Sequence, residues 1–337
     1  MASSSRDPNN FLMVVGSMAT GAGLMWWWQQ QRSRRSGANN SKYMLPSALS
    51  SSPYRQQVQL ALQLALQAGR NMYPYCDETG TAKQQRHDLG ISTKSKPEDF
   101  FTHIDVENET LVMQGIQAAF PHDAIIGEES VGTGGIPPLK ADTPTWIIDP
   151  IDGTTNFASG LPLTCVSIGY CVGGVPVMGV VYAPMTDEVF MAVKGHGCFR
   201  NGVRIQLLKN KKQKQLAEAM ICFEFGYSRQ PAQVARMVGA VQRILNHGCR
   251  ATRHLGSGVL DLCYVATGRL DAVYAGVAGE GWKPWDFCAG LVISEEAGCV
   301  IEAIDQKQRG PFDIYSSSHI CASSQELLEE VRKLVEN

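Results

Sequence analysis

The stretch that most restricts the fold is TWIIDPIDGTTNF, residues 145–157. Its apolar run, Trp146 to Ile148, is typical of a buried strand, and Asp149 follows at the carboxyl end of that run. Pro150 is expected to stop the strand and to fix a turn. Because ligand sites of α/β sheets gather at the carboxyl ends of strands, the stretch predicts a buried sheet that presents an acid to a ligand.

A second acid stands close to the first. Asp152 comes three residues after Asp149, Gly153 permits a sharp turn, and the Thr-Thr-Asn that follows favours the start of a helix. Two unpaired carboxylates at one place repel each other, and Mg²⁺ prefers oxygen ligands. We therefore expect a divalent metal ion between the two carboxylates. A phosphate group bound to it is expected to accept hydrogen bonds from the backbone N–H groups of Gly153 and Thr154.

Two further acidic positions point the same way. Glu128 and Glu129 directly follow the strand-like AIIG, and Asp286 stands at the start of an apolar helix in WDFCAG. Each alone is more simply explained as a helix cap or a surface acid, but together with the aspartates of DPID they favour a metal site. The spacing does not fit an EF-hand or the D-x-D-G-T pattern of covalent aspartyl phosphatases, so water is the expected nucleophile.

The remaining pattern predicts alternating strands and helices without strict βαβ order, which favours layered sheets and helices of the α/β (α+β) class. Gly173 and Gly174 join two strands in a predicted hairpin, and Ser323 with Glu326 predicts a capping box for the last helix. Helices are expected at about 54–72, 106–120, 232–246, 258–267, 286–297 and 323–337, and strands at 124–127, 145–149, 164–170, 175–182, 188–193, 202–205, 219–225, 270–275 and 299–304.

Charge and cysteine usage restrict the partners. The chain has 30 basic and 32 acidic side chains, a net charge of −2, which argues against nucleic acid as the main partner. Its 10 cysteines include no C-x-x-C pair and no Cys/His cluster with zinc spacing. Six of them stand in apolar runs and are expected to be buried free thiols in a reducing compartment: Cys165, Cys171, Cys222, Cys263, Cys288 and Cys299.

The first 53 residues form a separate segment in the sequence. Residues 11–28 carry no charge, and Arg32, Arg34 and Arg35 follow them. A run of this length just spans a bilayer core of about 30 Å, so we expect an uncleaved membrane anchor with a cytoplasmic catalytic domain. The alternative is a tail without a membrane role, because glycine and serine dilute the run. Residues 36–53 are expected to be a linker, and residues 54–337 the catalytic domain.

Three strings in this order, GEES, WIIDPIDGTTNF and WDFCAG, resemble signatures of the inositol monophosphatases, which belong to a superfamily of magnesium-dependent, lithium-sensitive phosphatases. The resemblance extends from about Tyr54 to the carboxyl end. It implies a layered αβαβα sandwich of the inositol monophosphatase and fructose-bisphosphatase type, usually a homodimer. The TTNF that follows DPIDG favours the inositol monophosphatase branch.

The resemblance also implies the ligands of two to three Mg²⁺ ions. Glu128, Asp149 and the carbonyl oxygen of Ile151 would hold the first metal, and Asp149, Asp152 and Asp286 the second. Glu128 would reach a third, weaker metal through water.

The segment TKSKPEDFFTHID (93–105) resembles another family stretch. By that match, Asp105 pairs with Thr154 to orient the attacking water, and Lys94 borders the site. Phe101 replaces the usual small aliphatic residue, a departure that is not expected to affect the chemistry.

Substrate binding is implied for a smaller set of residues. Gly256 and Ser257 resemble the loop before a helix that lines the family's pocket, and Glu280 is the candidate for binding substrate hydroxyls. The alternative for Glu280 is a solvated loop acid. Including groups already named, the implied substrate-binding residues are Lys94, Gly153, Thr154, Gly256, Ser257, Glu280 and Asp286.

The expected function is hydrolysis of myo-inositol monophosphates by in-line attack of a metal-activated water. The alternatives are the same chemistry on histidinol phosphate, galactose 1-phosphate or a nucleotide such as 3′-phosphoadenosine 5′-phosphate. A non-catalytic, membrane-tethered scaffold is a further alternative. It is disfavoured because Glu128, Asp149, Asp152, Thr154 and Asp286 are all retained.

Overall fold

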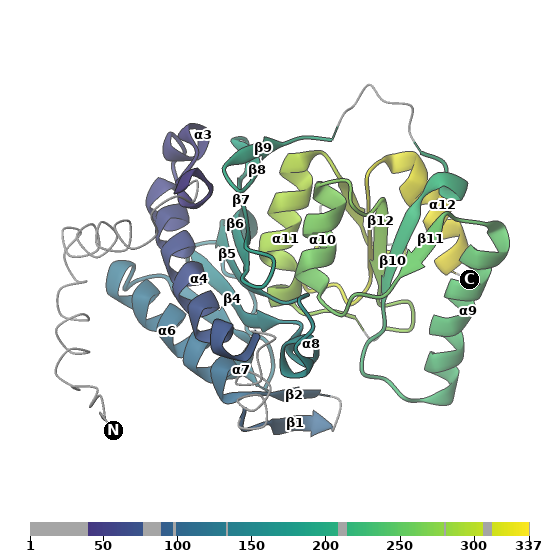
Figure 1. The fold of residues 1–337 in the computed structure, drawn as a ribbon, viewed down its shortest axis with the longest axis horizontal. Helices are drawn as coiled ribbons and strands as arrows, with labels where there is room; N and C mark the ends of the chain where they lie inside the picture. Colours follow the sequence, from purple (N-terminus) through teal and green to yellow (C-terminus); the bar gives the residue numbers. More distant parts are fainter. Residues whose placement is uncertain are drawn as a thin grey trace, which may run out of the picture.

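The structure is a computed structural model that describes residues 40–76, 89–96, 99–132, 134–207, 214–279, 281–305 and 312–336. Two large β-sheets and three layers of helices alternate in it (Figure 1).

The first sheet has seven strands in the order of the chain. They are β3 (Ala124–Gly127), β4 (Thr145–Asp152), β5 (Cys165–Val172), β6 (Val175–Ala183), β7 (Glu188–Val193), β8 (Gly197–Arg200) and β9 (Val203–Ile205). Strand β3 runs parallel to β4, and all later neighbours are antiparallel. Every residue of β4 and β7 is buried, because helices cover both faces of the sheet.

Helices α4 (Arg55–Cys76) and α6 (His103–Ala119) cover one face of this sheet, and α10 (Gly258–Ala266) and α11 (Pro284–Ala297) cover the other (Figure 1). The second sheet lies beyond α10 and α11. Its strands, in spatial order, are β11 (Ala251–Arg253), β10 (Met220–Glu224), β12 (Ala272–Ala275), β14 (His319–Ala322) and β13 (Val300–Glu302). Helices α9 (Pro231–His247) and α12 (Gln325–Val335) pack on its outer face.

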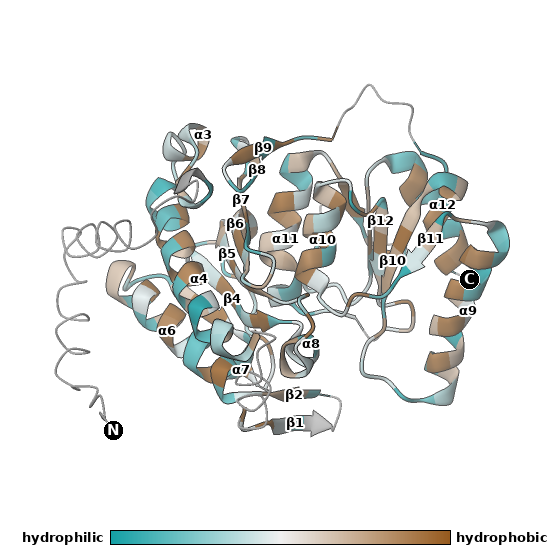
Figure 2. Ribbon diagram, in the orientation of Figure 1, coloured by the Kyte–Doolittle hydropathy of each residue, from teal (hydrophilic) through white to brown (hydrophobic). Residues whose placement is uncertain are grey.

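The five layers confirm the predicted αβαβα sandwich and its α+β class. Each interface between layers holds buried apolar side chains, such as Trp146 of β4 under α4 and α6, Phe287 of α11 between the sheets, and Leu328 of α12 against the second sheet. The outer helices α9 and α12 carry apolar and polar residues on opposite sides (Figure 2), as expected for helices with one buried face.

The position of α11 depends on two glycines of the first sheet. A Cβ added at Gly169 would collide with Cys288, and one at Gly179 would collide with the backbone of Ala289. Their absence lets α11 lie directly against β5 and β6. Because Asp286 is on the first turn of this helix, the glycines also fix where that carboxylate lies.

Several short elements complete the described part of the chain. They are η1 (Asn40–Tyr43), α3 (Ser47–Ser50), the two-stranded sheet of β1 (Ser92–Lys96) and β2 (Asp99–Phe101), α7 (Glu128–Val131), α8 (Thr154–Ser159) and η2 (Leu216–Glu218). Part of the expected linker is thus structured: Leu49 is fully buried, and Lys42 and Tyr43 bond to Asp187. A single apolar side chain among serines was too weak a pattern to predict this packing.

Other expectations differ in detail. The last helix is capped by Ser324, whose Oγ accepts from Leu327 N at 3.2 Å, so the predicted capping box of Ser323 and Glu326 is wrong. Strand β4 continues through Pro150 rather than stopping there. None of the helices in the described ranges is long and apolar enough to span a membrane. The predicted anchor, residues 11–28, lies outside those ranges.

Candidate metal centre and active site

The acidic residues expected from the sequence meet where β3 and β4 end and where α6, α8 and α11 begin. In Figure 1 this region lies around the labels of α7 and α8. Glu128 directly follows β3, Asp149 and Asp152 close β4, and Asp286 is the third residue of α11. Strand ends and helix starts therefore bring together acids from distant parts of the chain.

A bulge in β4 places its two aspartates on one side. Asp149 pairs with Ser167 and Asp152 with Cys165, so three steps along β4 match two along β5. In a regular strand, residues three apart point to opposite faces. The extra residue of the bulge reverses this, and Pro150 is tolerated because the ladder is interrupted there.

The carboxylates of Asp149, Asp152 and Asp286 form a compact cluster. One ligand oxygen from each lies within 4.8 Å of the others. Asp149 is 2% exposed and Asp152 5%, while Asp286 is partly buried. In the described part of the chain, no ion pair reaches any of these three groups.

Their electrostatics show how much charge remains uncompensated. Burial, reinforced by Glu128 and the neighbouring aspartates, raises the pKa of Asp149 well above its usual range. Burial and then Asp152 do the same to the pKa of Asp286. Burial raises the pKa of Asp152 to about 6, although hydrogen bonds from Ser257 and Val259 oppose the shift. Buried, mutually repelling oxygen donors are a set that fits a hard divalent cation such as Mg²⁺.

A second set of acidic residues, Glu128 and Glu129, contacts Lys94. Its Nζ donates to Glu128 Oε1 at 2.7 Å and to Glu129 Oε1 at 2.8 Å. Burial lowers the pKa of Lys94, but the charges and hydrogen bonds of both glutamates outweigh it and raise the value overall. Burial and Glu128 together raise the pKa of Glu129 to about 8. The centroid of the Phe101 ring lies 5.9 Å from Lys94 Nζ. The aromatic side chain that replaces a small aliphatic residue at this position therefore lies near the positive charge of Lys94.

Asp105 and Thr154 lie together, as the sequence match implied. The Thr154 hydroxyl is 3.3 Å from Asp105 Oδ1 and 3.0 Å from the Ile151 carbonyl oxygen, and its single hydrogen bonds to one of them at a time. Asp105 is fully buried and accepts from the backbone N–H of Thr102 at 2.8 Å and from its hydroxyl at 2.6 Å. Burial raises the pKa of Asp105 to about 6 against those bonds.

The loop of Gly256 and Ser257 contacts Asp152 and Gly153. The Ser257 hydroxyl donates to Asp152 Oδ2, and the Val259 N–H donates to the same oxygen at 3.1 Å. Gly153 has φ +81°, and a Cβ there would meet the Gly256 carbonyl oxygen at 3.0 Å. Glu280, the remaining candidate, lies outside the described residues.

Comparison with known proteins shows the family of the chain. The model of the inositol monophosphatase family matches residues 55–337. The chain belongs to the inositol monophosphatase family.

Individual members of this family resemble the chain over most of its length. Inositol monophosphatase 1 of Bos taurus is 32% identical over 287 residues, 85% of this chain and 96% of the relative. Inositol monophosphatase 2 of Solanum lycopersicum is 40% identical over 203 residues, 60% of this chain and 74% of the relative. The solved structure of inositol monophosphatase from Anabaena (Nostoc) sp. PCC 7120 is 28% identical in sequence with a TM-score of 0.65, and the match covers 83% of this chain and 95% of that chain.

Two residues of this family member that contact the site were not anticipated from its sequence. Glu109 accepts the N–H groups of Glu129 at 2.8 Å and Ser130 at 2.6 Å, and so fixes the start of α7 beside Glu128. Its position four residues after Asp105, on the same face of α6, was a usable signal. Asn156 donates from Nδ2 to the carbonyl oxygens of Leu163, Leu255 and Gly256, and no local pattern predicts these contacts.

Proposed function

We propose that the protein is a Mg²⁺-dependent phosphomonoesterase that hydrolyses myo-inositol monophosphates to inositol and phosphate. The observation that carries this proposal is the buried cluster of Asp149, Asp152 and Asp286, whose charge no ion pair in the described residues compensates. Membership of the inositol monophosphatase family supports the phosphatase class. The names of the bovine and tomato relatives favour an inositol phosphate as the substrate.

Two metal positions are proposed from the donor set. Glu128, Asp149 and the carbonyl oxygen of Ile151 would hold the first ion, and Asp149, Asp152 and Asp286 the second. A third ion would bind more weakly beside Glu128 through water. When bound, Mg²⁺ supplies positive charge against the phosphate and lowers the pKa of the attacking water.

The chain's own groups orient the reactants. When Thr154 donates its hydroxyl hydrogen to Asp105, its oxygen is free to accept a hydrogen bond from the water and to aim it at phosphorus. Glu128 stands on the other side of that water in the proposal. Lys94 holds the Glu128 and Glu129 carboxyl groups close together through its two hydrogen bonds.

Substrate contacts are proposed for the loops around the cluster. The phosphate would lie against the N–H groups of Gly153 and Thr154, with Lys94 and Asp286 at the edge of its site. Gly256 and Ser257 would contact the ring, and Glu280 would bind its hydroxyl groups. Because the metal cluster would bind only the phosphate group of the substrate, other small phosphate esters remain alternatives to inositol 1-phosphate.

The test is phosphate release by the full-length protein from inositol 1-phosphate, titrated with Mg²⁺ and then with Li⁺. We expect turnover that requires Mg²⁺ and is blocked by Li⁺. Release only from histidinol phosphate, galactose 1-phosphate or 3′-phosphoadenosine 5′-phosphate would keep the chemistry and change the substrate. No release from any of these esters would contradict the proposal and favour the scaffold alternative.

We also propose that the protein is a homodimer through an apolar groove between α9 and the end of β10. Phe225, Val238 and Leu245 are exposed there and line one apolar groove together with Phe223 and Val241. Phe223 belongs to β10, which pairs with β11, the strand at one edge of the five-stranded sheet. An exposed apolar patch next to a sheet edge suits a second copy of the chain.

Charges placed in this groove should separate the two copies. In the Val238→Asp/Leu245→Asp double variant we expect light scattering after gel filtration to report half the mass of the unchanged protein, because buried carboxylates oppose association. Val203→Asp, at another exposed apolar position on β9, is the matched control and should keep the dimer mass. An unchanged protein that is already monomeric at micromolar concentration would refute the proposal.

The amino-terminal segment carries a separate proposal, in which residues 11–28 anchor a cytoplasmic catalytic domain to a membrane. The uncharged run followed by arginines supports it. We expect the full-length chain to stay with membranes during alkaline carbonate extraction and a chain without residues 1–39 to be released. Release of both would contradict the anchor.

A further inference from the structure

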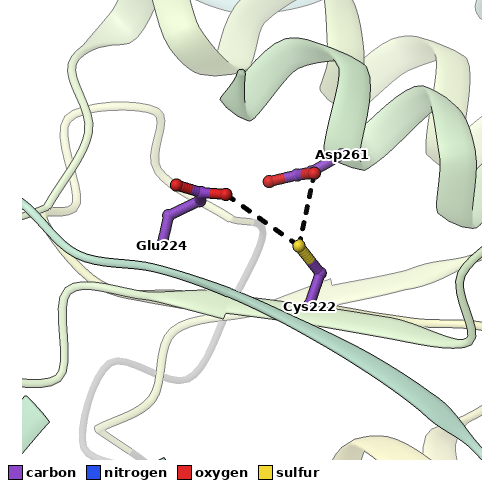
Figure 3. Close-up of side chains that lie close together, drawn as sticks. All are labelled: Cys222, Glu224 and Asp261. Carbon is purple, nitrogen blue, oxygen red and sulfur yellow. Dashed lines mark hydrogen bonds between the residues drawn. The ribbon is translucent and has the colours of Figure 1, made fainter. Parts of the chain in front are cut away.

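Three buried side chains lie together beneath the loop that holds Asp152. Cys222 and Glu224 come from β10 and Asp261 from α10, and Figure 3 shows the Cys222 sulfur facing both carboxyl groups. Its Sγ is 3.4 Å from Asp261 Oδ1 and 3.9 Å from Glu224 Oε1. None of the three was assigned a role from the sequence, and none belongs to the carboxylate cluster described above.

Glu224 holds the loop by its backbone. Its Oε1 accepts from Leu255 N at 2.8 Å and from Gly256 N at 2.9 Å. On the other side of the same loop, Asn156 Nδ2 donates to the carbonyl oxygens of Leu255 at 2.7 Å and Gly256 at 3.2 Å. The backbone of Leu255 and Gly256 is thus held from both sides, with an acceptor on β10 for the N–H groups and a donor on α8 for the carbonyl oxygens.

The next residue of the loop contacts the proposed metal cluster. Ser257 donates its hydroxyl hydrogen to Asp152 Oδ2, and the Val259 N–H supports the same oxygen at 3.1 Å. A continuous path of hydrogen bonds and backbone therefore runs from Glu224 through Leu255–Ser257 to Asp152. A loop fixed by a charged acceptor holds its donors in place better than a loop fixed by packing alone.

Asp261 and Glu224 differ in their contacts. Asp261 Oδ2 is buried and has no hydrogen-bond partner among the described residues. Burial, and then the charge of Glu224, raises the pKa of Asp261 well above its usual range. Glu224, by contrast, accepts two backbone N–H groups through Oε1, and its Oε2 lies 3.4 Å from His254 Nε2. Glu224 is therefore the carboxyl group of the pair that is tied to the loop.

A bound metal does not fit the backbone contacts of this cluster. The Glu224 oxygen that Cys222 contacts is Oε1, to which the two backbone N–H groups already donate. A cation there would compete with both hydrogen bonds and would release the loop. The hydrogen bonds that hold the loop therefore favour a cluster without a metal.

We propose that Glu224 is a positioning residue for Asp152: by fixing the loop Leu255–Ser257, it sets how tightly the second metal is bound. The inference rests on the proposed function, because it assigns a role within the same site. Glu224 does not touch substrate or metal in this proposal and acts only through the loop and Ser257.

The experiment compares full-length Glu224→Ala, Glu224→Gln and the control Glu218→Ala, an exposed acid on η2. Metal affinity is measured directly by titration with Mn²⁺ followed by electron paramagnetic resonance, and indirectly by the Mg²⁺ concentration that half-saturates turnover. We expect Glu224→Ala to weaken both by about ten-fold or more, a magnitude typical of groups that orient metal ligands. Turnover at saturating Mg²⁺ should change much less. Glutamine keeps an acceptor for both N–H groups and should restore most of the affinity.

A double-mutant cycle with Ser257→Ala separates positioning from a general structural defect. If Glu224 acts through Ser257, the effect of Glu224→Gln or Glu224→Ala on Mn²⁺ affinity largely disappears once Ser257 is alanine. Full additivity would overturn the inference, and so would unchanged Mn²⁺ affinity in Glu224→Ala. If the alanine variant does not fold by circular dichroism, the cycle with glutamine decides.

Two outcomes distinguish this inference from its alternatives. Stoichiometric zinc in the purified protein that is lost in Cys222→Ser would overturn it and make the cluster a metal site. If the unchanged protein releases no phosphate from any ester, the proposed function fails, yet weaker Mn²⁺ binding in Glu224→Ala would still support the positioning role.

Discussion

Replacing Asp149 with asparagine is expected to lower Mg²⁺-dependent turnover by about a thousand-fold, roughly 4 kcal/mol of transition-state stabilisation. Asp149 is the one side chain that both proposed metal positions share, so the loss of its charge should weaken the binding of both metal ions. Asparagine keeps the shape and can still accept the Ile151 N–H, now 3.0 Å from Asp149 Oδ1. The defect should therefore reflect charge and metal binding rather than a changed fold.

The same substitution should raise the melting temperature of the metal-free protein. In the absence of metal, burial and the charges of Glu128, Asp152 and Asp286 all oppose the ionisation of Asp149. Asparagine cannot ionise and avoids this cost, so activity and stability should change in opposite directions.

Phosphate release and calorimetry in EDTA measure the two effects. Asp142→Asn, which changes an exposed acid in the same way, is the matched control and should alter neither quantity. A lower melting temperature of Asp149→Asn in EDTA would contradict the repulsion argument. Near-normal turnover of that variant at ordinary Mg²⁺ would contradict the proposed metal site.

The stability of the metal-free protein should fall as pH rises. The pKa of both Asp105 and Asp152 is about 6 in the folded protein, against 3.8 as the ordinary value, and that of Glu129 is about 8 against 4.5. Between the ordinary and the folded values, the folded protein binds more protons than the unfolded chain. The stability from these groups is therefore complete below about pH 4 and is lost as pH rises past about 6, and past about 8 for Glu129.

Mg²⁺ should reverse this trend, because the metal binds the ionised carboxylates and only in the folded protein. We expect the free energy of unfolding in EDTA to fall by several kcal/mol between about pH 5 and pH 8, and excess Mg²⁺ to restore it at the higher pH. Denaturant titrations at both pH values, with EDTA and with Mg²⁺, make the comparison. Equal pH dependence of the unfolding free energy in EDTA and in Mg²⁺ would contradict the assignment of these carboxylates to a metal site. A Ca²⁺-free buffer with K⁺ in place of Mg²⁺ controls for ionic strength.

Local strings predicted much of the fold and of the acidic cluster. Asp149, Asp152 and Asp286 each stand next to an apolar run that marks a strand end or a helix start, and the structure brings these ends together. The hairpin around Gly173 and Gly174 was predictable for the same reason, since turn residues separate two apolar strands.

What could not be predicted depends on pairing between distant segments. The bulge at Pro150 requires the register of β5, so the sequence suggested a turn instead. Glu224 looks like an ordinary strand residue until the loop at Leu255 is folded against it. Strand β11 has only three residues, 251–253, and its existence follows from pairing with β10 rather than from its own pattern.

The proposed ligands lie far apart in the chain, and this spacing has a consequence for assembly. Asp149 and Asp152 belong to the seven-stranded sheet, whereas Asp286 begins a helix that also contacts the other half of the fold. A metal that joins Asp149 to Asp286 closes a loop of 286 − 149 = 137 residues, and closing so long a loop removes considerable freedom from the unfolded chain. Magnesium would thus act as a reversible cross-link between the two halves of the protein, and chelation would loosen the joint between them as well as stop catalysis.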